Sequence, residues 1–183
     1  MEALNQSDSD TTITELMIPS YANFGGKIHG GILLSLMDKV AYACATKHAG
    51  NYCVTVSVDE VEFLEPVEVG DLVSMMARVN YVGNTSLVVG IKVTAENVKK
   101  RLVKHTNTCY FTMVAKGDDD KPAQVPPLKL TSKLAMKRFA EAILRKELKR
   151  YHKSKVEEAK RAGGDVDFEA LFKDERCVVE LEA

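Results

Sequence analysis

Residues 29–47 constrain the fold of this chain more than any other segment, because they predict a helix that is apolar on almost every side. A glycine-rich loop leads into this helix, Gly50 is predicted to cap its C-terminal end, and Ser35, Asp38 and Lys39 are its main interruptions. A helix with such a pattern must be buried. No second long helix is predicted before residue 117, so the simplest solution is a sheet that wraps around this one.

Strands with a period of two account for most of the remaining sequence up to that point. The segments are residues 11–19, 54–58, 73–81, 87–95 and 102–115. We place a bulge near Asp59-Glu60, after which Val61 and Phe63 continue the second strand, and Gly83-Asn84 is typical of a hairpin turn. This order predicts an α+β fold in which a five-stranded antiparallel sheet surrounds the long helix.

Composition divides the chain into three parts. Residues 1–10 are predicted to be disordered, residues 11–130 to form the main domain, and residues 131–183 to form a C-terminal extension. In the extension, a basic helix over residues 131–161 ends at Gly163-Gly164, and an acidic tail follows. For the basic helix we favour a solvated surface, then a packing arm within an oligomer. A nucleic-acid or membrane contact is least favoured, because aromatic residues are sparse.

Composition also argues against several classes of protein. The formal net charge of −1 gives no overall attraction for nucleic acid, and no apolar run reaches the roughly 18–20 residues that span a bilayer. Residues 1–12 lack the basic and apolar regions of a signal peptide. The four cysteines show no Cys-x-x-Cys spacing and the four histidines no zinc-binding pattern. We therefore expect free thiols, no metal site and a cytoplasmic protein.

The glycine loop and the start of the helix combine features of a catalytic site. A carboxylate on a buried helix is costly unless it has a catalytic role or a polar partner, which makes Asp38 the first candidate. The backbone N–H groups of Gly30 and Gly31 lie where a helix N-terminus favours negative charge, so they are candidates for stabilising an oxyanion. The structural alternatives are an acid tied to a backbone N–H or to another subunit, and glycines that only permit close packing.

Several short motifs recur in an order that resembles the hotdog fold. They are Asn23, Gly30-Gly31 and Met37-Asp38, followed by residues 54–59, 63–67, 69–71, 95–97, 106–107 and 125–128. Each motif alone is weak. The ordered set, over about residues 11–128, is similar to that of the acyl-CoA thioesterases of the YciA and brain acyl-CoA hydrolase group. One position departs from the pattern: that group usually has an apolar residue before the double glycine, and this chain has His29, as in other hotdog thioesterase branches.

This resemblance implies an enzyme of fatty acid metabolism that hydrolyses acyl-CoA thioesters to CoA and a free carboxylic acid. Asp38 would act as the general base or as the nucleophile. Asn23 would orient the water or polarise the carbonyl for the Asp38 of a neighbouring chain; the structural alternative is a residue that only forms a turn. The resemblance further implies a homo-oligomer, at least a dimer and in full a hexamer built as a trimer of dimers. Coenzyme A enters only as part of the substrate, and no metal or redox cofactor is implied.

Two further sets of residues are candidates for binding CoA. By the same resemblance, Thr85 and Ser86 would touch it at the start of a strand; the alternative is a pair that only flanks a turn. Lys99 and Arg101 belong to a basic cluster that could pair with the phosphates of CoA. The alternative for this cluster is a solvated hairpin tip.

Two alternative functions are compatible with the same fold. A non-catalytic acyl-CoA sensor would bind the ligand without hydrolysing it, although a sensor has no need of both Asn23 and Asp38. A hydratase or dehydratase of 3-hydroxyacyl thioesters would need a histidine paired with an acid. His29 is the one histidine at the predicted helix entry that such a reaction could use.

Overall fold

The structure is a computed structural model that describes residues 1–59, 61–161, 167, 172–173 and 175–180. Within it the chain forms two compact units, Met1–Ile143 and Leu144–Ala183. The first unit extends past the predicted boundary at residue 130, because the first turns of helix α2 (Lys133–Arg161) pack onto it. In these turns Ala135 and Ala142 are buried, and the ring of Phe139 lies 5.0 Å from that of Tyr81.

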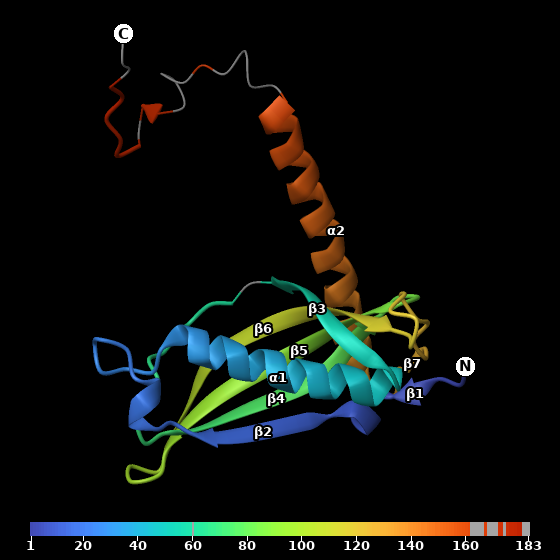
Figure 1. Cartoon of the computed structure of the whole chain (residues 1–183), viewed down its shortest axis with the longest axis horizontal. Coiled ribbons are helices and arrows are strands. Elements are labelled where there is room, and N and C mark those ends of the chain that lie inside the picture. The colour runs from blue at the N-terminus through green and yellow to red at the C-terminus, as the bar shows by residue number, and fades with distance from the viewer. Residues whose placement is uncertain (60, 162–166, 168–171, 174, 181–183) are drawn as a thin grey trace. The chain divides into compact units, whose positions relative to one another are not determined.

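The first unit holds a five-stranded antiparallel sheet curved around one long helix, which confirms the predicted hotdog fold. The strands are β2 (Thr11–Leu16), β3 (Tyr52–Asp59), β4 (Leu72–Val82), β5 (Ser86–Asn97) and β6 (Leu102–Lys116), in the spatial order β2-β4-β5-β6-β3. Figure 1 shows helix α1 (Gly30–Ala49) lying along one face of this sheet. A short parallel pair, β1 (Leu4–Asn5) and β7 (Leu128–Lys129), forms a second small sheet.

Local signals in the sequence explain where α1 begins and ends. The His29 side chain caps the helix by accepting a hydrogen bond from the Gly31 N–H, at 2.9 Å between the two nitrogens. At the other end Gly50 adopts a left-handed conformation with φ of 67°, which confirms its predicted place as the C-terminal cap. Both ends of the helix are therefore fixed, and this determines which residues face the sheet and which face away from it.

The core lies between α1 and the inward faces of the strands. Alternate residues of β4, β5 and β6 are almost completely buried against the helix. The β4–β5 hairpin closes at the predicted turn, with the Gly83 N–H donating to the Ser86 carbonyl at 2.7 Å. The bulge in β3 lies between Thr55 and Ser57, earlier than predicted, and no strand is assigned to Val61 and Phe63. Residue 60, within the predicted bulge, lies outside the described residues.

Helix α1 is not enclosed on every side, and on this point the sequence-based prediction was wrong. Its buried face consists of Leu33, Leu36, Met37, Val40, Ala41, Cys44, Ala45, His48 and Ala49. On the opposite face Leu34 and Tyr42 are 38% and 41% exposed, and Asp38 is also exposed. The sheet of a single chain covers only one side of a helix, so a partly apolar face remains uncovered.

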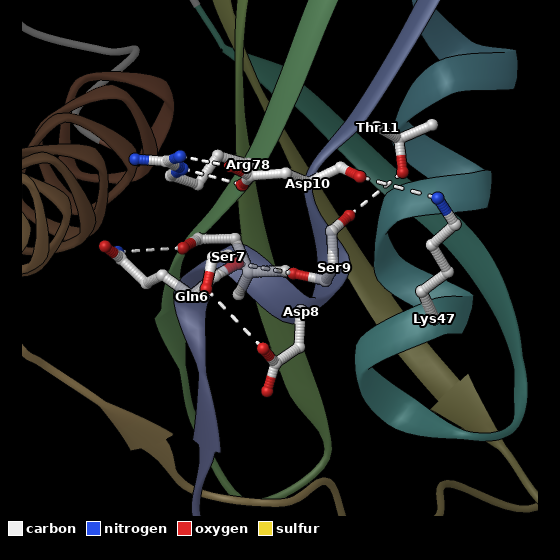
Figure 2. A network of polar contacts seen from close by, with 9 residues as sticks. Gln6, Ser7, Asp8, Ser9, Asp10, Thr11, Lys47 and Arg78 are labelled. Atoms are coloured by element: carbon white, nitrogen blue, oxygen red, sulfur yellow. Dashed lines mark hydrogen bonds and ion pairs between the residues drawn. The ribbon is translucent and has the colours of Figure 1, made fainter.

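The N-terminal segment is ordered, contrary to the disorder predicted for residues 1–10. A one-turn helix, η1 (Gln6–Ser9), packs where α1 and β4 come together, and Gln6 Nε2 donates to the Val79 carbonyl at 3.0 Å. Figure 2 shows Asp10 bound on one side by Arg78 and on the other by Lys47. Polar composition indicated solvation, but these side chains instead satisfy backbone and charged groups at the end of the sheet.

In the second unit, residues 144–161 continue α2 and are mostly exposed. Ion pairs three or four residues apart run along it, such as Lys155 with Glu158 at 2.8 Å. The predicted end at Gly163-Gly164 and much of the acidic tail lie outside the described residues. None of the described helices combines the length and the hydropathy needed to cross a membrane.

Candidate active site

The pairing of Asp38 with Thr55 is the most specific polar contact on the uncovered face of α1. Thr55 Oγ1, on β3, donates a hydrogen bond to Asp38 Oδ1 at 2.6 Å. It also lies 3.2 Å from Met113 Sδ, but a carboxylate is much the stronger acceptor. No other described residue bonds to the second carboxylate oxygen, so Asp38 is oriented by β3 and still has lone pairs for a reactant.

A hollow of about 310 Å³ opens beside this carboxylate. It is lined by Asp38, Lys39, Tyr42, Tyr52, Cys53, Val54, Thr55 and Met113. The rings of Tyr42 and Tyr52 lie 5.9 Å apart at 58°, a tilted arrangement that favours aromatic packing. We call this the α1–β3 hollow. It places one carboxylate against a largely apolar wall, which suits an apolar substrate with one reactive polar group.

Asp38 is exposed in a single chain, whereas the sequence predicted a buried acid. The reason is its position on the helix face that points away from the sheet. A carboxylate in this position remains hydrated, and water must be excluded before it can act in a low-dielectric site. A bound substrate or a further surface laid over α1 would exclude that water.

Asn23 does not contact Asp38 within one chain. Its Oδ1 accepts hydrogen bonds from the backbone N–H groups of Gly25 and Lys27, at 2.9 and 3.2 Å. These bonds close a tight turn in which Gly26 has φ of 76°, a conformation that favours glycine. Asp38 lies about 12 Å along the helix axis from Gly30, where the loop ends. The structure therefore shows the turn-forming role of Asn23 and leaves its side-chain NH₂ exposed.

The two glycines at the start of α1 differ in what their backbone N–H groups can do. The Gly31 N–H is already bound by the ring of His29, so it is not free to meet an oxyanion. Among the described residues none accepts a bond from the Gly30 N–H. A Cβ added at Gly30 would lie 3.4 Å from the Phe63 ring, an ordinary van der Waals contact. Gly30 is thus the better oxyanion candidate.

The candidate CoA-binding residues fall into two groups that lie far apart. Thr85 and Ser86 precede β5 and begin it, while Lys99 and Arg101 are in the turn after it. A strand as long as β5 separates its two ends by about 36 Å. One chain therefore does not bring the two groups together around one phosphate.

The basic turn and the loop that carries Asn23 both lie near Glu68. Lys27 in that loop binds Glu68, and this hydrogen bond lowers the pKa of the Glu68 carboxyl below its ordinary value. The charges of Lys104 and Lys100 lower it further. Several ammonium groups thus surround one carboxylate, and the excess positive charge suits an anionic ligand. Among the described residues, no three metal-ligating side chains converge.

Comparison with known proteins gives a consistent set of similarities. Residues 25–101 match the thioesterase superfamily. The chain is 47% identical to the protein VdlD of Helicobacter pylori, over 73% of this chain and 76% of that one. It is 34% identical to an acyl-CoA thioester hydrolase of Zymomonas mobilis, described as uncharacterised, over 70% and 86%. It is 31% identical to the cytosolic acyl coenzyme A thioester hydrolase of Rattus norvegicus, over 74% of this chain but only 36% of that protein.

Solved structures agree with these matches. An acyl-CoA hydrolase of Staphylococcus aureus, solved with butyryl-CoA and CoA, is 27% identical, with a TM-score of 0.78 over 87% of this chain and 98% of that one. A hexameric acyl-CoA thioesterase is 30% identical, with a TM-score of 0.80 over 83% and 97%.

The S. aureus enzyme was also solved as separate variants in which an asparagine, an aspartate and a threonine are replaced by alanine. The replaced positions are 15 and 17 residues apart, the same spacing as Asn23, Asp38 and Thr55 here. The sequence analysis missed Thr55, although it lies within the 54–59 motif. The available signal was a hydroxyl in a strand that follows a carboxylate-bearing helix.

Proposed function

The chain belongs to the thioesterase superfamily, and on this premise we propose that it hydrolyses acyl-CoA thioesters to CoA and a free carboxylic acid. One observation carries the proposal: a carboxylate, Asp38, held by a threonine hydroxyl at the mouth of the largely apolar α1–β3 hollow. The hollow suits an acyl chain, and the carboxylate suits the activation of water or direct attack on the thioester.

Each residue of the site has a proposed role in the reaction. Asp38 removes a proton from the attacking water or itself attacks the carbonyl carbon, and Thr55 keeps its carboxylate in position. The Gly30 N–H, at the positive end of α1, stabilises the developing oxyanion. Collapse of the intermediate breaks the C–S bond, and CoA leaves as a thiol after protonation. In the route of direct attack, Asp38 forms a mixed anhydride with the acyl group as CoA leaves, and water then hydrolyses this anhydride to the free acid and the Asp38 carboxylate. Oxygen-18 from water that is found in Asp38 after a single turnover identifies this route, because the general-base route places the label in the product acid alone.

Asn23 completes the site from a neighbouring chain. Within one chain its loop ends about 12 Å along the helix axis from Asp38, and its exposed NH₂ has no described partner. Oriented by its turn, this group can donate to the water or to the thioester carbonyl of the adjacent subunit. Such an arrangement also lays a second surface over Asp38 and excludes bulk water.

The exposed apolar surface supports a homo-oligomer, at least a dimer and in full a trimer of dimers. Strand β3 is the edge of the sheet next to the site and pairs only with β6. Its Tyr52, Val56 and Val58 are 57%, 55% and 39% exposed. An exposed strand edge with apolar side chains favours pairing with a strand of another chain. Several solved relatives are described as hexameric.

We assign the CoA phosphates to the basic turn with Lys99 and Arg101, which like the Asn23 loop lies near Glu68. Thr85 and Ser86 would then touch CoA bound to a different chain, because β5 separates the two groups. No metal or redox cofactor is needed for hydrolysis of a thioester. A cytoplasmic location fits the rat relative, which is named as cytosolic.

The structure favours this function over a hydratase. His29, the histidine that a hydratase would need, binds the Gly31 N–H through Nδ1 and serves as a helix cap. A sensor that only binds acyl-CoA would gain nothing from a carboxylate oriented by Thr55. Both alternatives remain outcomes of the assay.

The direct test is thiol release from a panel of acyl-CoA substrates, with crotonyl-CoA hydration measured in parallel. We expect hydrolysis, and we expect Asp38→Asn to lower kcat by at least about 100-fold, the scale of a lost general base. Asp118→Asn, at an exposed turn and outside the residues that line the hollow, is the matched control and should keep full activity. Undiminished turnover by a folded Asp38→Asn variant would exclude the assigned role, and binding without turnover would indicate a sensor.

A further inference from the structure

The residue after Asn23 is a fully exposed aromatic ring. Phe24 has a relative exposure of 114%, the highest of any large hydrophobic side chain that is described. We propose that Phe24 inserts into the α1–β3 hollow of a second copy of the chain and forms one wall of that copy's acyl site. This inference rests on the proposed function, because it extends the shared site from Asn23 to its neighbour.

The loop holds the Phe24 ring outward by its own backbone bonds. Asn23 Oδ1 accepts from two backbone N–H groups, and the Asn23 N–H donates to the Lys27 carbonyl at 2.7 Å. The Gly26 N–H donates back to the Asn23 carbonyl at 3.0 Å. A turn closed by four hydrogen bonds loses little further entropy when its tip docks, so Phe24 is a preorganised anchor.

The hollow offers matching walls for such a ring. The tilted pair Tyr42 and Tyr52, with Val54 and Met113, supplies aromatic and apolar surface, and its volume of about 310 Å³ can hold a phenyl ring with space to spare. Aromatic residues, phenylalanine among them, are enriched in the buried core of protein interfaces. The space left beside the ring is where the acyl chain of the substrate would lie.

A second copy, rather than the same chain, has the geometry to deliver Phe24. Consecutive Cα atoms are 3.8 Å apart, so a loop that brings Asn23 to the Asp38 of a neighbour brings Phe24 to the hollow beside it. Two α1 helices packed antiparallel through their uncovered faces place the loop of one near Tyr42 of the other. The exposed Leu34 then lies at the centre of that contact.

This arrangement makes the second chain a determinant of substrate size. The Phe24 ring occupies part of the hollow, so the remaining space suits shorter acyl chains. Phe24→Ala should therefore raise kcat/KM for long-chain relative to short-chain acyl-CoA by at least about tenfold, since each additional buried CH₂ changes the ratio about fourfold and removal of the ring makes room for two or more. Leu148→Ala, at a residue that is 57% exposed on α2, is the control and should leave that ratio unchanged.

Fluorescence tests the docking without any substrate. The chain has no tryptophan, so Phe24→Trp introduces a single reporter. In the oligomer we expect blue-shifted emission and acrylamide quenching several-fold weaker than for Tyr151→Trp, which lies on the exposed part of α2. Adding Tyr52→Ala to Phe24→Trp should loosen the packing and raise the quenching. An exposed reporter in the oligomer, or one shielded only after CoA is added, would overturn the inference.

A second measurement covers the case in which the tryptophan disturbs the loop. Sedimentation should show that Phe24→Ala raises the dimer Kd at least about tenfold, with Phe24→Leu intermediate. The effects of Phe24→Ala and Tyr52→Ala should be less than additive, since both remove the same contact. Full additivity would contradict the docking. Because neither measurement needs turnover, failure of the docking and failure of the proposed hydrolase activity are separate results.

Discussion

Replacing Thr55 by valine tests whether a single hydroxyl positions the reactive carboxylate. Valine has nearly the shape of threonine, so it fills the same space beside Met113 while it removes the hydroxyl that bonds Asp38 at 2.6 Å. Hydrogen bonds to charged groups contribute about 1.5–3 kcal/mol. At a factor of ten for each 1.4 kcal/mol, Thr55→Val should lower kcat about 10- to 150-fold.

The control for this prediction is Thr55→Ser, which keeps the hydroxyl and loses only a methyl group. It should retain activity within a few-fold of the unaltered chain. The assay is steady-state thiol release at saturating and subsaturating acyl-CoA, with folding checked by thermal unfolding. Because the hydroxyl touches the carboxylate and not the CoA, the loss should lie in kcat while KM changes little.

Two results would refute the reasoning about Thr55. Activity of Thr55→Val within twofold of the unaltered chain would show that Asp38 needs no such partner. Equal damage in Thr55→Ser and Thr55→Val would show that the shape of the side chain matters and not its hydroxyl.

Two further predictions concern the rest of the molecule. A chain ending at Ile143 should keep its fold and activity. A chain ending at Leu130 should melt at a lower temperature, because it exposes the surface that Phe139 covers. Equal melting temperatures of the two chains would argue against this packing. Burial raises the pKa of the Cys44 and Cys109 thiols from an ordinary value near 9 to about 12. The folded state therefore holds these protons longer than the unfolded state, so the stability they contribute is complete below pH 9 and is lost as the pH rises toward 12. In this range each thiol lowers the free energy of unfolding by about 1.4 kcal/mol per pH unit. Urea unfolding at pH 8 and 10 should show this decline, and Cys44→Ala should make the decline shallower.

The sequence was a good guide to this fold because its local signals agree with one another. The strand periods, the Gly83-Asn84 turn and the cap at Gly50 each depend on neighbouring residues, and all three are confirmed. The N-terminal segment was wrongly predicted because its order depends on distant partners. Gln6 binds a carbonyl of β4, and Asp10 binds Arg78 on the same strand.

The exposure of Asp38 was wrongly predicted for a different reason. Apolar residues around the whole of α1 indicate burial, but they do not indicate which surface provides it. One face packs on the sheet of the same chain, while Leu34 and Tyr42 remain exposed in a single chain. Thr55 was missed because sequence alternation shows that a strand residue is polar but not which helix residue it meets.

Mixing two inactive variants tests most directly the central claim that Asp38 of one chain acts with Asn23 of another on an acyl-CoA. Asn23→Ala and Asp38→Asn would be purified separately, exchanged in equal amounts, and assayed for thiol release, with subunit exchange confirmed by mass spectrometry. In a two-fold symmetric dimer, half of the exchanged dimers are mixed and each holds one intact site, so activity should return to about one quarter of the unaltered level. Confirmed exchange without any recovery would contradict the shared site.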